Sequence, residues 1–226
     1  MADETGLRIG SFAGAPIIVD PTVLLLALYV LVTGALAGGG LITAVIFLAA
    51  LLLAVLLHEF GHAGVAALLR LPSKRIVLTF FGGHVEFDGS LKARWQEIAV
   101  SFAGPATNLL TFAICIPILG GAVGWSNNAL FFVFQLERIS LILGLFNLLP
   151  GFPLDGGRIL RAALHYFMPL GRARLVAGCC GVLVAIGLAS WAYGRQLWWT
   201  IIVAVVLALA AWAEIQSARA SLARSG

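Results

Sequence analysis

Leu56-Leu57-His58-Glu59-Phe60-Gly61-His62-Ala63 is the stretch that decides the fold and the chemistry of this 226-residue chain. It carries the pattern His-Glu-x-x-His inside a long apolar run. Residues four apart lie one above the other on one face of an α-helix, so His58 and His62 can hold one zinc ion together. A catalytic zinc takes three protein ligands and keeps one position open, so a third ligand must come from elsewhere. Glu59 is predicted to act as general base toward the attacking water, not as a ligand.

An accidental occurrence of this pattern is the alternative. The motif is flanked by apolar residues on both sides, over 51–57 and 63–69. Three ionisable side chains in such a helix are costly in hydrocarbon and are kept only where they face a partner or a cavity. We therefore interpret the motif as a functional site.

The composition is that of an integral membrane protein, with 61% hydrophobic and 11% charged residues. The net charge of +4 does not indicate a nucleic-acid partner, because the basic residues lie at the ends of apolar spans and are not clustered as a recognition surface. The three cysteines all fall within apolar spans, which favours packing roles over a disulfide framework.

The hydropathy pattern predicts an all-α membrane bundle of six transmembrane helices with small membrane-associated β-hairpins. The spans are expected at about 21–36, 41–69, 96–122, 129–149, 173–193 and 197–217, with a short helix at 158–167. Residues 7–20 are expected to form two short extended runs, and residues 76–87 a β-hairpin with its tight turn at Gly82-Gly83. We expect residues 1–226 to form a single integral-membrane core without an appended soluble domain.

Basic residues fix the predicted orientation. Of 14 Lys and Arg residues, one side of the predicted bundle carries Arg8, Arg70, Lys74, Arg75, Lys92, Arg94, Arg158, Arg161, Arg172, Arg174, Arg219 and Arg224. The positive-inside rule then predicts a multi-pass protein of the cell membrane with both termini cytoplasmic. His62 precedes Arg70 by eight residues, which puts the metal roughly 12 Å below the cytoplasmic surface at 1.5 Å per residue.

Asp155 is the predicted third ligand. It is the only acid in the segment 151–157, where two prolines and three glycines are expected to prevent a regular helix. Non-helical backbone at membrane depth is tolerated where it lines a cavity. The alternative, which the residues themselves leave open, is that Asp155 caps the helix that follows.

Three motifs together resemble the site-2 protease family of intramembrane zinc metalloproteases. They are the histidine motif, the run Asn147-Leu148-Leu149-Pro150-Gly151-Phe152-Pro153-Leu154-Asp155-Gly156-Gly157, and Gly104-Pro105-Ala106-Thr107-Asn108, which is similar to that family's G-P-x-x-N element. Phe81-Gly82-Gly83 is similar to its membrane-associated hairpin. The resemblance covers nearly the whole chain, without the PDZ or nucleotide-sensing CBS modules of many members.

The resemblance implies one Zn²⁺ per chain held by His58, His62 and Asp155, with Glu59 as the catalytic base. It implies that Asn147 holds the scissile peptide or its oxyanion, and it brings Asn108 near the site. The implied activity is hydrolysis of a peptide bond within the transmembrane segment of a single-pass membrane protein. No pattern in the sequence indicates the identity of that substrate or an oligomeric state.

Two other functions compete with proteolysis. A zinc transporter would need ionisable residues along several spans, and beyond the motif and Asp155 only Glu97, Glu137, Arg138 and Glu214 are available. A catalytically inactive binding protein would not need the base and all three ligands. We interpret Glu137-Arg138 as a neutralised pair. His84 could cover the open zinc position or bind the backbone of the substrate. The alternative is a histidine at the membrane interface with neither role, and this interpretation is favoured.

Overall fold

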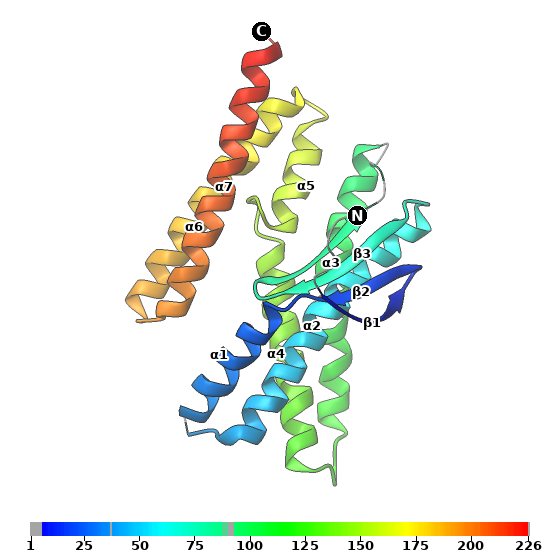
Figure 1. Cartoon of the computed structure of the whole chain (residues 1–226), viewed down its shortest axis with the longest axis vertical. Helices are drawn as coiled ribbons and strands as arrows, with labels where there is room; N and C mark the ends of the chain where they lie inside the picture. Colours follow the sequence, from blue (N-terminus) through cyan, green and yellow to red (C-terminus); the bar gives the residue numbers. More distant parts are fainter. Residues whose placement is uncertain (1–5, 37, 88, 90–92, 226) are drawn as a thin grey trace. The chain divides into compact units, whose positions relative to one another are not determined.

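The computed structural model describes residues 6–36, 38–87, 89 and 93–225 (Figure 1). Lys92, one of the basic residues used for the orientation, lies outside the described residues. The chain divides into two compact units. One comprises residues 1–90 and 103–145, and the other residues 91–102 and 146–226.

A four-stranded mixed sheet opens the first unit. Its strands are β1 (Leu7–Phe12), β2 (Ala15–Val19), β3 (Ser73–Thr79) and β4 (Gly82–Phe87), in the order β1-β2-β3-β4. The hairpin predicted at residues 76–87 and the two extended runs predicted at 7–20 are confirmed; the two runs pair as a hairpin, and a parallel pairing of β2 with β3 joins both hairpins into one sheet (Figure 1). Sequence patterns show each hairpin, whereas this pairing connects segments more than fifty residues apart.

The predicted turn of the second hairpin is wrong by two residues. Phe80 and Phe81 form the turn, and Gly82 already pairs with Thr79 as the first residue of β4. Gly82 has φ of +128°, a conformation that L side chains rarely adopt, so glycine is needed where the strand leaves the turn. The glycine pair therefore belongs to the strand and not to the loop.

Four helices complete the first unit. They are α1 (Val23–Leu36), α2 (Gly40–Leu68), and the parts of α3 (Arg94–Gly120) and α4 (Asn127–Asn147) that cover residues 103–120 and 127–145. At the entry to α1, Thr22 donates backbone and hydroxyl hydrogen bonds to Asp20, which hold the pKa of that carboxyl below its usual range. Ala50 and Ala54 of α2 pack with Cys115 of α3 and Leu136 of α4, so small residues let the helices approach closely.

The second unit consists of α5 (Asp155–Leu164), α6 (Leu170–Gly194), α7 (Trp198–Ser225) and the first residues of α3. Helices α6 and α7 lie side by side (Figure 1). A Cβ on Gly178 would lie 2.7 Å from the Ile215 side chain, and one on Gly181 would lie 2.9 Å from Ala211. Small residues on α6 thus permit this close packing.

Five helices of the described chain are long and apolar enough to cross a membrane, namely α2, α3, α4, α6 and α7. The predicted count of six is not confirmed, because α1 has 14 residues. At 1.5 Å per residue α1 is about 21 Å long, against a hydrocarbon core of about 30 Å. The protein is nonetheless a mostly helical, multi-pass membrane protein with a small sheet.

Candidate metal centre

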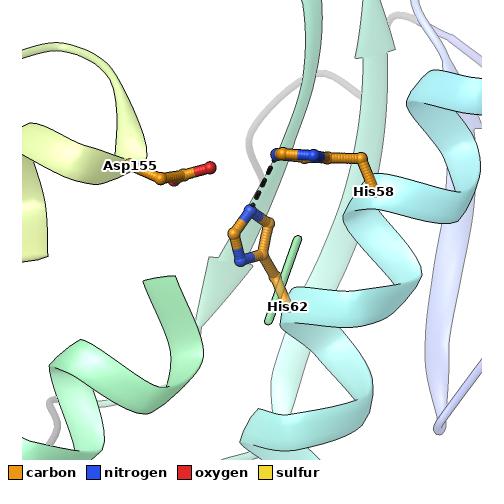
Figure 2. Close-up of side chains that lie close together, drawn as sticks. All are labelled: His58, His62 and Asp155. Atoms are coloured by element: carbon orange, nitrogen blue, oxygen red, sulfur yellow. Dashed lines mark hydrogen bonds between the residues drawn. The ribbon is translucent and has the colours of Figure 1, made fainter. Parts of the chain in front are cut away.

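The two motif histidines lie on one face of α2 with their ring nitrogens together (Figure 2). His58 and His62 are buried, and their Nε2 atoms are 3.1 Å apart. Two nitrogens that each lie about 2.0–2.1 Å from a tetrahedral zinc are separated by about 3.3–3.4 Å. The pair is therefore preorganised at nearly the spacing that one zinc ion requires.

Glycines on α2 and α3 let the two helices approach closely beside these rings. A Cβ on Gly61 of α2 would lie 2.4 Å from the carbonyl oxygen of Ala103 on α3. A Cβ on Gly104 of α3 would lie 2.3 Å from Nε2 of His62 and 2.7 Å from Nε2 of His58. No larger residue fits at either position without displacing backbone or imidazole, so the G-P-x-x-N element has a steric role beside the ring nitrogens.

Glu59 lies beneath the sheet. It is 4% exposed, and a Cβ on Gly83 of β4 would lie 2.7 Å from its Oε1 atom. The sheet is held on α2 next to it by the stacked rings of Phe12 and Phe60, whose centroids are 4.1 Å apart. The backbone of β4 thus crosses directly over the carboxylate, a role for Gly83 that the sequence analysis missed when it placed this residue in a turn.

Asp155 is the first residue of α5, in the second unit. The short helix begins three residues earlier than the predicted 158, so Asp155, Gly156 and Gly157 are helical and the expected irregular segment ends sooner. A Cβ on Gly156 would lie 2.3 Å from the carbonyl oxygens of Leu148 and Leu149, and one on Gly157 would lie 2.3 Å from Gly151. The preceding loop folds back onto the first turn, which only glycine permits.

The capping alternative for Asp155 does not fit this helix start. Leu154 occupies the N-cap position, with extended φ and ψ, and Asp155 lies one residue inside. An acid in the first helical turn is still favoured by the helix dipole. Helix capping therefore does not account for the choice of aspartate here.

Among the described residues, one group of metal-binding side chains is close enough to share an ion, and it consists of His58, His62 and Asp155 (Figure 2). The candidate ligand atoms all lie within 4.8 Å of one another, and all three residues are buried. Two imidazoles and one carboxylate form a donor set typical of catalytic zinc.

The other predicted site residues have different placements. Asn147 is the last residue of α4, eight residues before Asp155. Asn108 is fully buried on α3, and neither its amide nitrogen nor its oxygen has a hydrogen-bond partner in the described part of the chain. It lies one turn beyond Gly104, on the same face of α3, and side chains on a helix lean toward the N-terminus. This spacing puts Asn108 on the face of α3 that also carries Gly104, whose backbone lies beside the ring nitrogens.

His84 has an exposed side chain on the opposite face of β4 from Gly83, because successive strand residues alternate. Its Nε2 atom lies 3.7 Å from Oε1 of Glu86. Arg75 donates to the same carboxylate at 2.7 Å and holds the pKa of Glu86 below its usual value. The structure therefore does not bring His84 to the histidine pair.

Comparison with known proteins assigns the family. The model of peptidase family M50 matches residues 46–125 and 120–190. A relative from Synechocystis sp., named as a zinc metalloprotease, is 36% identical over 172 residues, covering 70% of this chain and 44% of the relative. Zinc metalloprotease MJ0392 of Methanocaldococcus jannaschii is 33% identical over 158 residues, covering 70% of this chain and 45% of that relative. The matched segments cover less than half the length of these relatives.

A solved structure extends the likeness to the whole fold. The site-2 protease from Methanocaldococcus jannaschii matches with a TM-score of 0.73 and 26% identity, over 93% of this chain and 95% of that one. The family model covers more than half of the chain, and both motif histidines lie within the matched residues. The chain therefore belongs to peptidase family M50, the site-2 protease family of zinc metalloproteases.

Proposed function

We propose that this protein hydrolyses a peptide bond within the transmembrane segment of a single-pass membrane protein. The observation that carries this proposal is the pair of buried imidazoles 3.1 Å apart, with Glu59 between them, on an apolar helix long enough to cross a membrane. An ordinary membrane helix has no reason to hold three ionisable groups at this depth.

One zinc ion per chain is held by His58, His62 and Asp155. The support is the donor set, the 4.8 Å limit on the distances between ligand atoms, and the space that Gly104 leaves beside both ring nitrogens. When bound, zinc supplies a Lewis acid that polarises the scissile carbonyl and favours ionisation of the attacking water.

Glu59 accepts the proton of the attacking water and later delivers it to the departing amine. Its position one residue after His58 keeps it close to the metal ligands without making it one. Asn147 donates its side-chain amide to the scissile peptide or to the oxyanion that develops there. Asn108 supplies a second amide, whose two polar atoms are buried and have no partner in the described residues.

A transmembrane substrate must unwind before its backbone can be attacked, because helical carbonyls are engaged in hydrogen bonds. Strand β4 offers a place for the unwound segment. It is an edge strand of the described sheet, and its backbone crosses over Glu59 at Gly83. An extended peptide added to this edge would be held by backbone hydrogen bonds beside the base.

The membrane topology completes the proposal. Helix α1 forms a sixth, short span, and both termini lie on the cytoplasmic side because the basic residues gather there. The metal lies nearer this side, so cleavage falls in the cytoplasmic half of the substrate segment. Residues that break helices in that half accelerate cleavage by lowering the cost of unwinding.

The test is co-reconstitution of the purified protein with a panel of single-pass proteins, followed by mass spectrometry of the products. The proposal expects cleavage by the wild type, about one zinc per chain, and a strong loss of zinc in Asp155→Ala. Undiminished zinc in that variant would remove Asp155 from the ligand set. A cut in the outer half of the segment would contradict the topology.

A further inference from the structure

The sequence interpretation of Glu137-Arg138 as a neutralised pair does not agree with the structure. Consecutive residues on a helix point about 100° apart and do not face each other. Among the described residues, neither side chain has a hydrogen bond or an ion pair, and the contact of the Arg138 guanidinium is the Phe134 ring, 5.3 Å away. Two charges in the middle of a membrane-spanning helix thus have no partner of opposite sign within the described chain.

These charges lie on the outer stripe of α4. An open hollow of about 310 Å³ is lined at helical spacing by Phe134, Glu137, Arg138, Leu141 and Ile142. Residues at this spacing form a stripe along one face of the helix, against which a second helix can pack. The opposite face of α4 carries Leu136, Ser140 and Gly144, which are buried in the first unit. The hollow therefore belongs to a face that the first unit's own packing leaves uncovered.

The position of the charges along α4 makes their exposure costly. Arg138 is roughly 16 Å from Asn127, the first residue of the helix, at 1.5 Å per residue. Arg138 is also nine residues before Asn147, the last residue of the helix. Charged side chains at such positions almost always face a protein partner or a water-filled cavity. Ile142, one turn along the stripe, is 61% exposed, so the surroundings of Arg138 are those of a lipid-facing or protein-facing surface.

We propose that this stripe of α4 is the contact surface between two copies of this chain, with Glu137 of each copy paired with Arg138 of the other. Insertion gives every copy the same orientation, so a two-fold axis along the membrane normal places α4 parallel to its copy at equal depth. The positions of Glu137 and Arg138 along the helix axis differ by about 1.5 Å, so Glu137 of one copy and Arg138 of the other lie at nearly the same depth. The two-fold axis makes this ion pair occur twice. A different partner helix would have to bring both an acid and a base to this depth.

The experiment uses the full chain in liposomes, with association measured by energy transfer between labelled copies. Glu137→Arg and Arg138→Glu should each weaken self-association about tenfold, because like charges then meet across the axis. Mixing these two variants should restore association, and so should the double variant E137R/R138E. An unchanged zinc content shows that each variant is folded.

A second measurement is independent of charge. In a chain whose three native cysteines are replaced, Leu141→Cys, which lies on the helix face between Glu137 and Arg138, should form a disulfide between copies. The matched control is Leu183→Cys on the exposed face of α6, which should not. A monomeric wild type, failure of the mixed variants to associate, or equal cross-linking at both positions would overturn the proposal. Cross-linking of Leu141→Cys to a co-reconstituted single-pass protein in place of its own copy would also overturn it.

Discussion

Glu59 and Glu214 are both buried carboxylates in long apolar helices, 4% and 9% exposed, but their surroundings differ in kind. Arg174 donates to both oxygens of Glu214, at 2.6 and 3.1 Å, and Nη1 of Arg161 lies 3.9 Å from one of them. Glu59 lies against Gly83 of β4, where a Cβ would come within 2.7 Å of its Oε1 atom.

The second unit extends the arginine network to a fourth helix, because Arg161 of α5 also forms a salt bridge with Glu97 of α3. Four helices are thereby tied by charges whose partners come from the protein itself. A carboxylate whose oxygens are occupied by arginine is a structural anchor. The Glu59 carboxylate is instead approached by the backbone of Gly83, where a Cβ would lie 2.7 Å from Oε1. The contrast separates an acid held by arginines from the acid that we propose as the catalytic base.

The strongest way to break this contrast is to remove the charge of each acid in turn. Glu59→Gln should lower the cleavage rate by about 10²- to 10⁴-fold, because the general base is lost while the metal ligands remain. Glu214→Gln should leave cleavage per folded molecule unchanged and lower stability by about 1–3 kcal/mol. Cleavage rates in proteoliposomes, zinc content and thermal unfolding check both. Substantial residual cleavage by Glu59→Gln would defeat its assignment as the base.

A second prediction tests whether glycine is required beside the proposed metal ligands. Gly104→Ala should displace the imidazoles and reduce zinc content and cleavage together, by about tenfold or more, because its Cβ would lie 2.3 Å from Nε2 of His62. The matched control is Gly120→Ala at the end of the same helix, where a Cβ meets nothing within 4 Å. Elemental analysis of both variants measures the effect, and full zinc occupancy in Gly104→Ala would refute it.

A methyl group over the base is a milder change. Gly83→Ala should lower the cleavage rate roughly tenfold with zinc retained, because the new Cβ pushes the Glu59 carboxylate from its position. Gly10→Ala in β1 is the control, since its Cβ would lie 3.9 Å from its nearest neighbour, an ordinary contact. Equal rates for the two variants would show that β4 does not constrain Glu59.

The smallest expected effect concerns a third acid, Glu86, which is paired with Arg75 near the surface. Each of these two side chains is 31% exposed. Arg75 lowers the pKa of Glu86, so the pair stabilises the folded state above the ordinary glutamate value of 4.5 and loses this effect as the pH falls below it. The difference in unfolding free energy between wild type and Glu86→Gln should be about 0.5 kcal/mol near pH 7 and should vanish in acid. A difference that persists at low pH would mean that the ion pair is not its source.

The sequence alone predicted a histidine pair able to share a metal, because the relative placement of His58 and His62 depends only on local spacing. His58 and His62 are one helical turn apart wherever that helix lies, and apolar runs of more than twenty residues mark α2, α3, α4, α6 and α7 without tertiary information. The motif around Asp155 likewise contributed to the family resemblance, and its Gly156 and Gly157 meet a steric demand from nearby residues of the same segment.

Only the tertiary structure decided which surfaces these residues meet. The parallel pairing of β2 with β3 carries Gly83 over Glu59, and the packing of α3 on α2 brings Gly104 to the ring nitrogens. Neither contact has a periodicity or a spacing that a sequence could display, because it joins segments distant along the chain. The same reason explains Glu137 and Arg138. Adjacency in sequence predicted a neutral pair, whereas helix geometry turns the two side chains apart, and the described residues offer neither an ion pair.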